Sequence, residues 1–137
     1  MPHQLEFDIE YRYASIKGGI WIPAILSAGA DSTGVEAKVD TGCEYCVFQR
    51  EVADQLGLEV ESGYRLRLGS PGGDVETYTH LIRLETLGLS FDSVVCFRAD
   101  YGFTRNLLGR NGWLNQVKLA VIDYEETLFI SPYNQPQ

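Results

Sequence analysis

The sequence has few basic residues and no long hydrophobic run. Its 11 lysines and arginines stand against 19 aspartates and glutamates, and the formal net charge is -8. Because binding to phosphate groups needs a basic surface, this balance argues against a nucleic-acid partner. The longest apolar run, Ile20–Leu26, is too short to span a bilayer and is interrupted by Pro23. We therefore expect no nucleic-acid partner and no membrane association.

Targeting signals and cysteines are also scarce. Residues 1–13 lack the basic start and apolar stretch that mark a signal peptide. The three cysteines, an odd number, fit free thiols in a reducing compartment better than a disulfide framework. The expected localisation is therefore cytoplasmic.

The remaining composition indicates a folded β protein. The chain has 137 residues, of which 45% are hydrophobic, enough for one domain with a substantial core. Its 14 glycines and its 12% of aromatic residues favour short strands joined by tight turns. We predict a single domain over residues 1–137, with its core at about 5–130 and a frayed tail at 131–137 that contains two prolines.

Hydrophobic periodicity predicts an all-β fold with one or two short helices. A helix is predicted over Gln49–Leu56 with Gly57 as its C-cap, and a second short helix is expected after Asn111. The segments 29–34 and 69–74 are predicted to be a loop and a hairpin tip. The strands are expected at residues 5–13, 20–27, 34–39, 64–68, 75–87, 91–98, 117–122 and 128–130.

The chain is organised around the point where a strand meets an acid. Val35, Ala37 and Val39 alternate along a predicted strand that stops at Asp40, followed by Thr41 and Gly42. Aspartate and glycine favour turns, so the carboxylate of Asp40 is held at the end of a buried strand. Taken alone, this Asp-Thr-Gly is also compatible with a plain β-turn whose aspartate accepts backbone hydrogen bonds.

A second motif changes this interpretation. Two leucines at 107–108 are followed by Gly109, Arg110 and Asn111, and a glycine-rich hairpin lies between the two motifs. Together the motifs resemble those of the retropepsin-like, single-domain aspartic proteases, over roughly residues 34–130. The resemblance implies an acid-protease closed barrel. The stretch 31–34, Asp-Ser-Thr-Gly, is superficially similar to the first motif, but no apolar strand precedes it and we predict it to be loop.

The resemblance also implies a mechanism that needs two chains. Aspartic proteases share one proton between two close carboxylates, which activate a water molecule. Because this chain carries one such motif, Asp40 would work with its copy in a homodimer. Thr41 would lock the two loops across the dimer axis, and Gly42 would let a substrate backbone approach. The next position, usually alanine or serine in the family, is Cys43.

Two further groups of residues take roles from the resemblance. Glu44 would pair with Arg110 and brace the active-site loop, with Asn111 beside it; otherwise Arg110 caps the short helix or faces solvent. The hairpin tip would act as a flap that closes over an extended peptide, although an ordinary exposed hairpin has the same composition. The residues of this tip are Gly69, Ser70, Pro71, Gly72 and Gly73.

Other chemistry finds less support in the sequence. Cys43 and Cys46 form a CxxC that, with His80 and Cys96, allows a zinc or redox interpretation, but no second CxxC is present. A packed or surface role suits His80 better, and the two tryptophans are expected in the core. No Gly-x-Ser-x-Gly occurs that would suggest a serine hydrolase.

The sequence therefore predicts an aspartic endopeptidase that needs no metal and no cofactor and acts on peptide or protein substrates. The alternative keeps the fold without catalysis, as an inactive dimerisation or peptide-binding module. A purely structural β-barrel oligomer would leave Asp40 and Arg110 unexplained.

Overall fold

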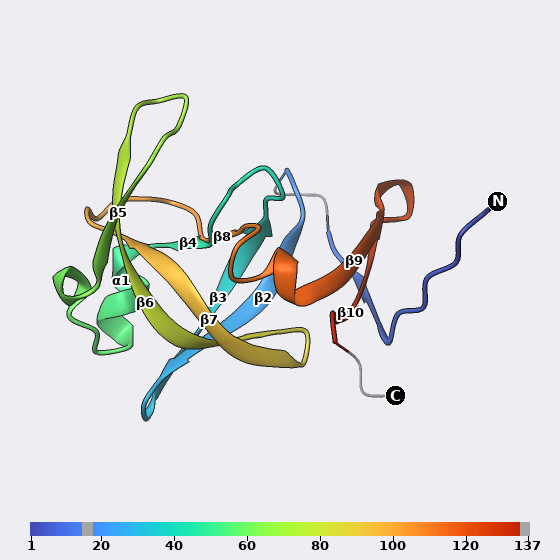
Figure 1. Cartoon of the computed structure of the whole chain (residues 1–137), viewed down its shortest axis with the longest axis horizontal. Coiled ribbons are helices and arrows are strands. Elements are labelled where there is room, and N and C mark those ends of the chain that lie inside the picture. Colours follow the sequence, from blue (N-terminus) through green and yellow to red (C-terminus); the bar gives the residue numbers. More distant parts are fainter. Residues whose placement is uncertain (15–17, 135–137) are drawn as a thin grey trace.

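The computed structural model describes residues 1–14 and 18–134 and consists mainly of β-strands (Figure 1). One α-helix and three short 3-10 turns accompany them: α1 (Arg50–Gln55), η2 (Val60–Ser62), η3 (Leu114–Gln116) and η4 (Asp123–Glu125). The strands are β1 (Ile9–Arg12), β2 (Trp21–Ala28), β3 (Asp31–Val39), β4 (Val47–Phe48), β5 (Tyr64–Leu68), β6 (Val75–Thr86), β7 (Leu89–Arg98), β8 (Leu107–Leu108), β9 (Val117–Ile122) and β10 (Thr127–Pro132).

Most strands form a closed barrel. The seven-stranded sheet has the order β2-β3-β8-β4-β7-β6-β5, and β2 also pairs with β6, which closes a ring and leaves β5 outside it. The long strand β6 makes this possible, because its first half pairs with β5 and its last residues pair with β2. The all-β closed barrel that the sequence predicted is confirmed.

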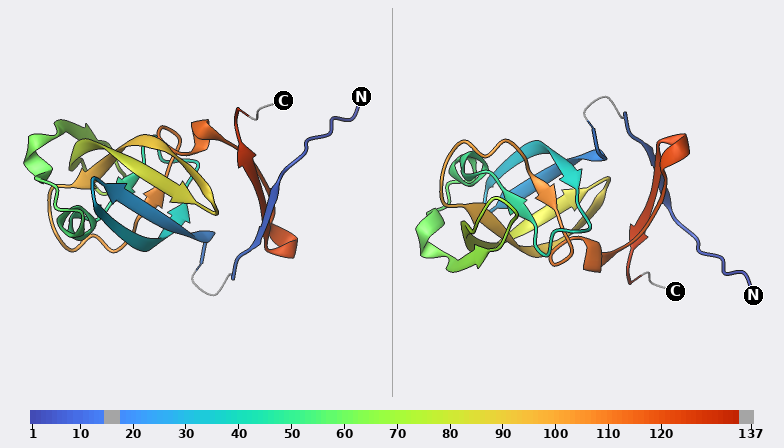
Figure 2. Two further views of the ribbon diagram at one scale, coloured as in Figure 1. Left: turned by 90° about the horizontal axis from the view of Figure 1, so that it is seen from below. Right: turned by 90° about the horizontal axis from the view of Figure 1, so that it is seen from above.

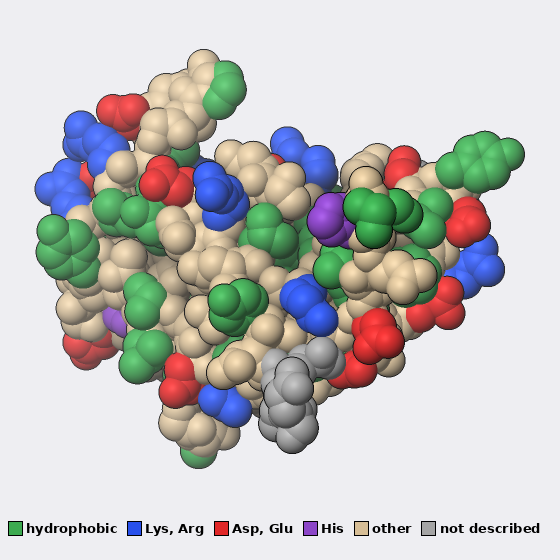
Figure 3. Space-filling model, turned by 45° about the vertical axis from the view of Figure 1, so that its right-hand side comes forward, with side chains coloured by type: hydrophobic (Ala, Val, Ile, Leu, Met, Phe, Trp, Pro, Cys, Tyr) green, Lys and Arg blue, Asp and Glu red, His purple; other side chains and the backbone are tan. Residues whose placement is uncertain are grey.

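The remaining strands form a separate sheet beside the barrel. Strand β10 lies between β1 and β9 and pairs antiparallel with both (Figure 2). Segments from near the two ends of the chain are thus side by side, while the residues before β1 run outward from the molecule (Figure 1). On the face shown in Figure 3, acidic and basic side chains are interspersed and form no continuous basic patch.

Both sheets contribute to one hydrophobic core. Buried residues of the barrel, such as Ile22 and Phe97, belong to the same cluster as Leu128 and Ile130 of β10. Trp113 is fully buried, as predicted, and its indole N–H donates to the Thr86 hydroxyl at 2.9 Å. Trp21 is only half-buried. No helix in the described parts of the chain has the length and apolar character needed to cross a membrane.

Several boundaries differ from those that the sequence predicted. Strand β3 begins at Asp31, so the predicted loop at 29–34 reduces to the turn at Gly29 and Ala30, and the Asp-Ser-Thr-Gly stretch is strand. Pairing with β2 overrides its turn-forming residues, because all of β3 from Asp31 to Lys38 has a partner there. The turn at Gly57 is confirmed, since Gly57 has φ +69° and its N–H donates to Asp54.

The chain ends also differ. The first predicted strand begins at Ile9 rather than residue 5, and Leu5 is 70% exposed. The predicted frayed tail begins too early, because Ser131 and Pro132 continue β10 and Ser131 is buried against the sheet. Residues 135–137 of that tail lie outside the described residues. The expected second helix is only the 3-10 turn η3, after a bend at Gly112 that has φ +101°.

Candidate active site

Asp40 lies at the end of β3, where the sequence predicted it. Val39 pairs in parallel with Leu108, and the Asp40 N–H donates to the Leu108 carbonyl at 2.9 Å. The chain then turns sharply, since the Cys43 N–H donates back to the Asp40 carbonyl at 3.1 Å. The half-buried carboxylate of Asp40 accepts the Gly42 N–H at 3.1 Å. Hydrogen bonds of both its backbone and its carboxylate therefore fix the position of Asp40.

The second motif holds this loop through backbone hydrogen bonds. The Arg110 N–H donates to the Cys43 carbonyl at 2.9 Å, and the Asn111 N–H donates to the Glu44 carbonyl at 2.8 Å. Gly109 permits this approach, because a Cβ there would lie 2.6 Å from the Cys43 carbonyl oxygen and even closer to that of Tyr45. The two motifs, far apart in sequence, thus form one backbone-bonded unit.

The side chains predicted to brace this unit do not meet within one chain. Glu44 and Arg110 are both exposed, and no ion pair joins them among the described residues. The backbone hydrogen bonds take over that bracing. Thr41 is exposed as well, and its hydroxyl has no hydrogen bond within the described ranges. Asn111 is exposed and contributes its backbone N–H to the unit.

The predicted flap is a hairpin that faces Asp40. Strands β5 and β6 form it, and its tip is closed by the Gly73 N–H, which donates to the Ser70 carbonyl at 3.0 Å. The hairpin and the loop between β3 and β4 project to the same side of the molecule (Figure 1). Gly69, Ser70 and Pro71 line one cleft with Asp40, with a volume of about 360 Å³, whereas Gly72 and Gly73 lie at the tip beyond it.

The cleft has an apolar lining with a few charges. Its apolar walls are Val47, Leu68, Val75, Phe103 and Leu107. Its charged side chains are Asp40, Arg98 and Arg105, and Cys43 lies beside Asp40. Sequence reasoning missed the contribution of Arg98, Phe103 and Arg105. A signal was present for two of them, because Phe103 and Arg105 come directly before the second motif.

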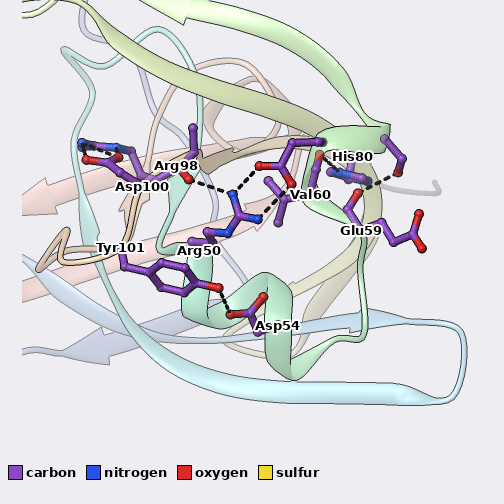
Figure 4. A network of polar contacts seen from close by, with 11 residues as sticks. Arg50, Asp54, Glu59, Val60, His80, Arg98, Asp100 and Tyr101 are labelled. Carbon is purple, nitrogen blue, oxygen red and sulfur yellow. Dashed lines mark hydrogen bonds and ion pairs between the residues drawn. The ribbon is translucent and has the colours of Figure 1, made fainter.

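A polar network holds the loop between β7 and β8, which carries Phe103 and Arg105 and begins directly after Arg98. The Arg50 guanidinium in α1 donates to the Ala99 carbonyl at 2.7 Å and makes a two-point ion pair with Glu61 (Figure 4). The Tyr101 hydroxyl donates to Asp54, also in α1, at 2.7 Å. These contacts tie residues 99–101 to the helix.

A second set of contacts fixes the other end of the same loop. The Gln49 side-chain amide donates to the Phe103 carbonyl at 2.6 Å, and its backbone N–H donates to Asn106 Oδ1 at 2.9 Å. Asn106 is buried and returns a hydrogen bond from Nδ2 to Gln49 Oε1. The loop that forms one wall of the cleft is therefore clamped at both ends.

The cysteines and His80 have positions that suit packing. Cys46 and Cys96 are buried, and burial raises the pKa of the Cys46 thiol to about 12. Cys43 is half-buried, and its pKa is raised by burial first and then by the charge of Asp40. The His80 ring contacts the Val60 carbonyl at 2.9 Å and packs edge-on against Phe97. In the described residues, no group of three or more His, Cys, Asp or Glu could hold a metal.

The structure thus presents the Asp40 carboxylate beneath a hairpin, on a loop that is hydrogen-bonded to the second motif. The family model described as aspartyl protease matches residues 26–112, and the chain belongs to this family. The predicted resemblance to retropepsin-like proteases is therefore confirmed. No match was found among curated protein sequences.

Solved structures show the same fold. A retropepsin-like aspartic protease from Rickettsia conorii matches with a TM-score of 0.67 at 18% identity, covering 90% of this chain and 97% of that one. EIAV protease, in complex with the inhibitor HBY-793, matches with a TM-score of 0.55 at 17% identity, covering 71% of this chain and 86% of that one. At these identities the likeness concerns the retropepsin-like fold.

Proposed function

We propose that this protein is an aspartic endopeptidase that hydrolyses peptide bonds in protein or peptide substrates. The observation that carries the proposal is the Asp40 carboxylate, presented in a cleft with apolar walls beneath the β5–β6 hairpin. Among the described residues, Asp40 is the only acid that lines this cleft. Acid–base hydrolysis by an aspartate pair therefore needs a second carboxylate from elsewhere.

The second carboxylate is proposed to be Asp40 of a second copy, in a homodimer. Two carboxylates that lie close together cannot both ionise, so they share one proton. The ionised member takes a proton from the attacking water, and the protonated member donates its proton to the substrate carbonyl oxygen, which gives a gem-diol. As the C–N bond breaks, the first carboxyl passes its proton to the leaving amine and the second takes a proton from the gem-diol, so that the pair again shares one proton. The exposed Thr41 hydroxyl, with no partner among the described residues of one chain, supports a contact across the dimer axis.

The flap and the motif unit have distinct parts in this proposal. The hairpin closes over the bound peptide and excludes water from the cleft. Gly42 lets the substrate backbone approach beside Asp40, where a Cβ would stand in van der Waals contact with the carboxylate oxygen, at 3.4 Å. No metal or cofactor takes part. The alternative, an inactive peptide-binding module of the same fold, retains the cleft and the flap without the proton shared at Asp40.

The test compares Asp40→Asn with a matched control, Asp31→Asn, in the exposed Asp-Ser-Thr-Gly stretch of β3. Both variants and the wild type are incubated with a diverse peptide library between pH 4 and 7, and products are identified by mass spectrometry. We expect Asp40→Asn to lose roughly 10²–10⁴-fold in rate and Asp31→Asn to retain activity. Equal cleavage by all three proteins, or cleavage by none of them, would contradict the proposal.

A mixing experiment tests whether two copies share the site. Excess Asp40→Asn chains are added to a fixed amount of wild type, and the remaining activity is measured. If each site needs one Asp40 from each copy, mixed pairs are impaired and activity falls as the variant is added. An unchanged activity would indicate that one chain is sufficient.

A further inference from the structure

More basic than acidic side chains line the cleft, although the whole chain is acidic. The chain has a formal net charge of -8, yet two arginines and a single acid line the cleft. Both arginines lie near the loop that the Arg50 and Gln49 contacts hold in place, Arg98 at the end of β7 and Arg105 just before β8. A positive side chain beside apolar walls can select among ligands by charge, so the question is which of the two arginines is free to do so.

The two arginines are not equivalent. Arg98 is already occupied, because it pairs with Asp100 at 3.0 Å and its guanidinium lies 4.3 Å from the centre of the Phe103 ring. Its side chain is only 15% exposed. Arg98 therefore positions the Phe103 wall of the cleft and offers little charge to a ligand.

Arg105 is available. It is exposed, and no hydrogen bond or ion pair joins its guanidinium to any residue in the ranges 1–14 and 18–134. It lines the same cleft as Asp40 and the apolar Leu107. Its backbone is fixed, since the neighbouring Asn106 is buried and exchanges hydrogen bonds with Gln49. A guanidinium held by a rigid backbone at the rim of a cleft is suited to bind a carboxylate.

We propose that the cleft selects peptides in which an aspartate or glutamate side chain stands beside apolar residues, and that Arg105 binds that acidic side chain. The apolar neighbours fill the space between Val47, Val75 and Leu107, while the acidic side chain reaches the guanidinium. This substrate class rests on the proposed peptidase function for its biological meaning. The binding preference itself exists whether or not the peptide is cleaved.

The test uses peptides that differ at one position. A peptide from the library is synthesised with Glu, Gln or Lys placed in turn at each of three positions on either side of its centre. Binding is measured by fluorescence anisotropy with the Asp40→Asn variant, so that no cleavage interferes, and cleavage is measured with wild type. At one position, we expect Glu to bind about tenfold more tightly than Gln and Lys to bind more weakly than both.

Variants of Arg105 assign the preference. In the Asp40→Asn background, Arg105→Glu is expected to reverse it, so that Lys is favoured over Glu at that position. Arg105→Gln, a smaller change for the fold, is expected to remove the difference between Glu and Gln. The matched control is Arg83→Glu, which alters the net charge equally but removes an exposed pair with Asp92 outside the cleft. This control should keep the preference for Glu.

The outcomes separate the two proposals. Equal affinity for Glu and Gln peptides at every position, or a preference that survives Arg105→Glu, would overturn the role of Arg105 even if the peptides are cleaved. A Glu preference that depends on Arg105 in the absence of cleavage would retain this inference and move the proposed function to a peptide-binding module. If Arg83→Glu loses the preference for Glu as fully as Arg105→Glu does, the preference would come from the net charge of the protein. That result would contradict the proposed role of Arg105.

Discussion

The carbonyl oxygen of Tyr45 occupies the space that a side chain at Gly109 would need. The loop after Asp40 crosses so closely over the second motif that a Cβ on Gly109 would also lie 2.6 Å from the Cys43 carbonyl oxygen. Backbone atoms cannot give way as the end of a flexible side chain can. The glycine of the second motif is thus explained by the position of the first.

We expect Gly109→Ala to lower the free energy of unfolding by about 3 kcal/mol, because the added methyl group overpacks a backbone contact. The control is Gly72→Ala at the tip of the β5–β6 hairpin, where a Cβ would meet nothing within 4 Å, and where we expect a change below about 0.5 kcal/mol. Urea unfolding measures both. Equal stability of the two variants would contradict the close approach.

The buried hydrogen bond between Trp113 and Thr86 joins the segment after the second motif to the end of strand β6. Both residues are fully buried, so Thr86→Val leaves the indole N–H without an acceptor and should cost about 1–3 kcal/mol. The exposed Thr104→Val is the control and should change stability by less than about 0.5 kcal/mol. Denaturant midpoints that fall together for both threonine variants would argue against this contact.

The ion pair of Arg50 and Glu61 should make stability depend on pH. Its hydrogen bonds hold the pKa of Glu61 below its ordinary value, so the folded state is stabilised above about pH 4.3 and loses this contribution as the pH falls through the lower folded pKa. Compared with Glu61→Gln, wild type should therefore have its largest advantage in melting temperature above about pH 5 and a shrinking one below pH 4.

The control for this pH dependence is Glu59→Gln. The Glu59 side chain is exposed and points away from the Arg50 network in Figure 4. Its substitution should leave the curve of melting temperature against pH unchanged. A constant difference between wild type and Glu61→Gln at all pH values would show that the ion pair does not contribute.

Thiol labelling should distinguish Cys43 from the other two cysteines. Cys46 and Cys96 are buried, and only the half-buried Cys43 can react in the folded protein. We expect iodoacetamide to add one label natively and three after unfolding, as counted by mass spectrometry. Because burial and the nearby Asp40 raise the pKa of Cys43, its labelling rate should keep rising above about pH 8.5.

Two outcomes bear on this labelling prediction. Cys43→Ala should abolish native labelling, and labelled wild type should lose peptide binding because Cys43 lines the cleft. Native labelling of two or three cysteines would contradict the burial of Cys46 and Cys96.

Local sequence pattern was sufficient where a residue's own neighbours decide the structure. The helix before Gly57, the hairpin tip at 69–74 and the strand that ends at Asp40 were all predicted from turn residues and periodicity, and the structure confirms them. The local pattern predicted the wrong secondary structure where pairing with another strand decides the structure of the segment. Residues 31–33 have turn-forming side chains but form strand because β2 lies beside them, and Ser131 is held in β10 by β9.

The sequence by itself determined the place of Asp40 at the end of a strand, the two motifs and hence the family, since these depend on residue types in a short order. Only the tertiary structure decided how the motifs join and what else lines the cleft. Bracing by Glu44 and Arg110 was expected from side chains, whereas backbone hydrogen bonds over Gly109 supply it in one chain. Arg98 enters the site at the end of β7 and Arg105 on the clamped loop that follows it, and long-range packing of that kind leaves no periodic signal in the sequence.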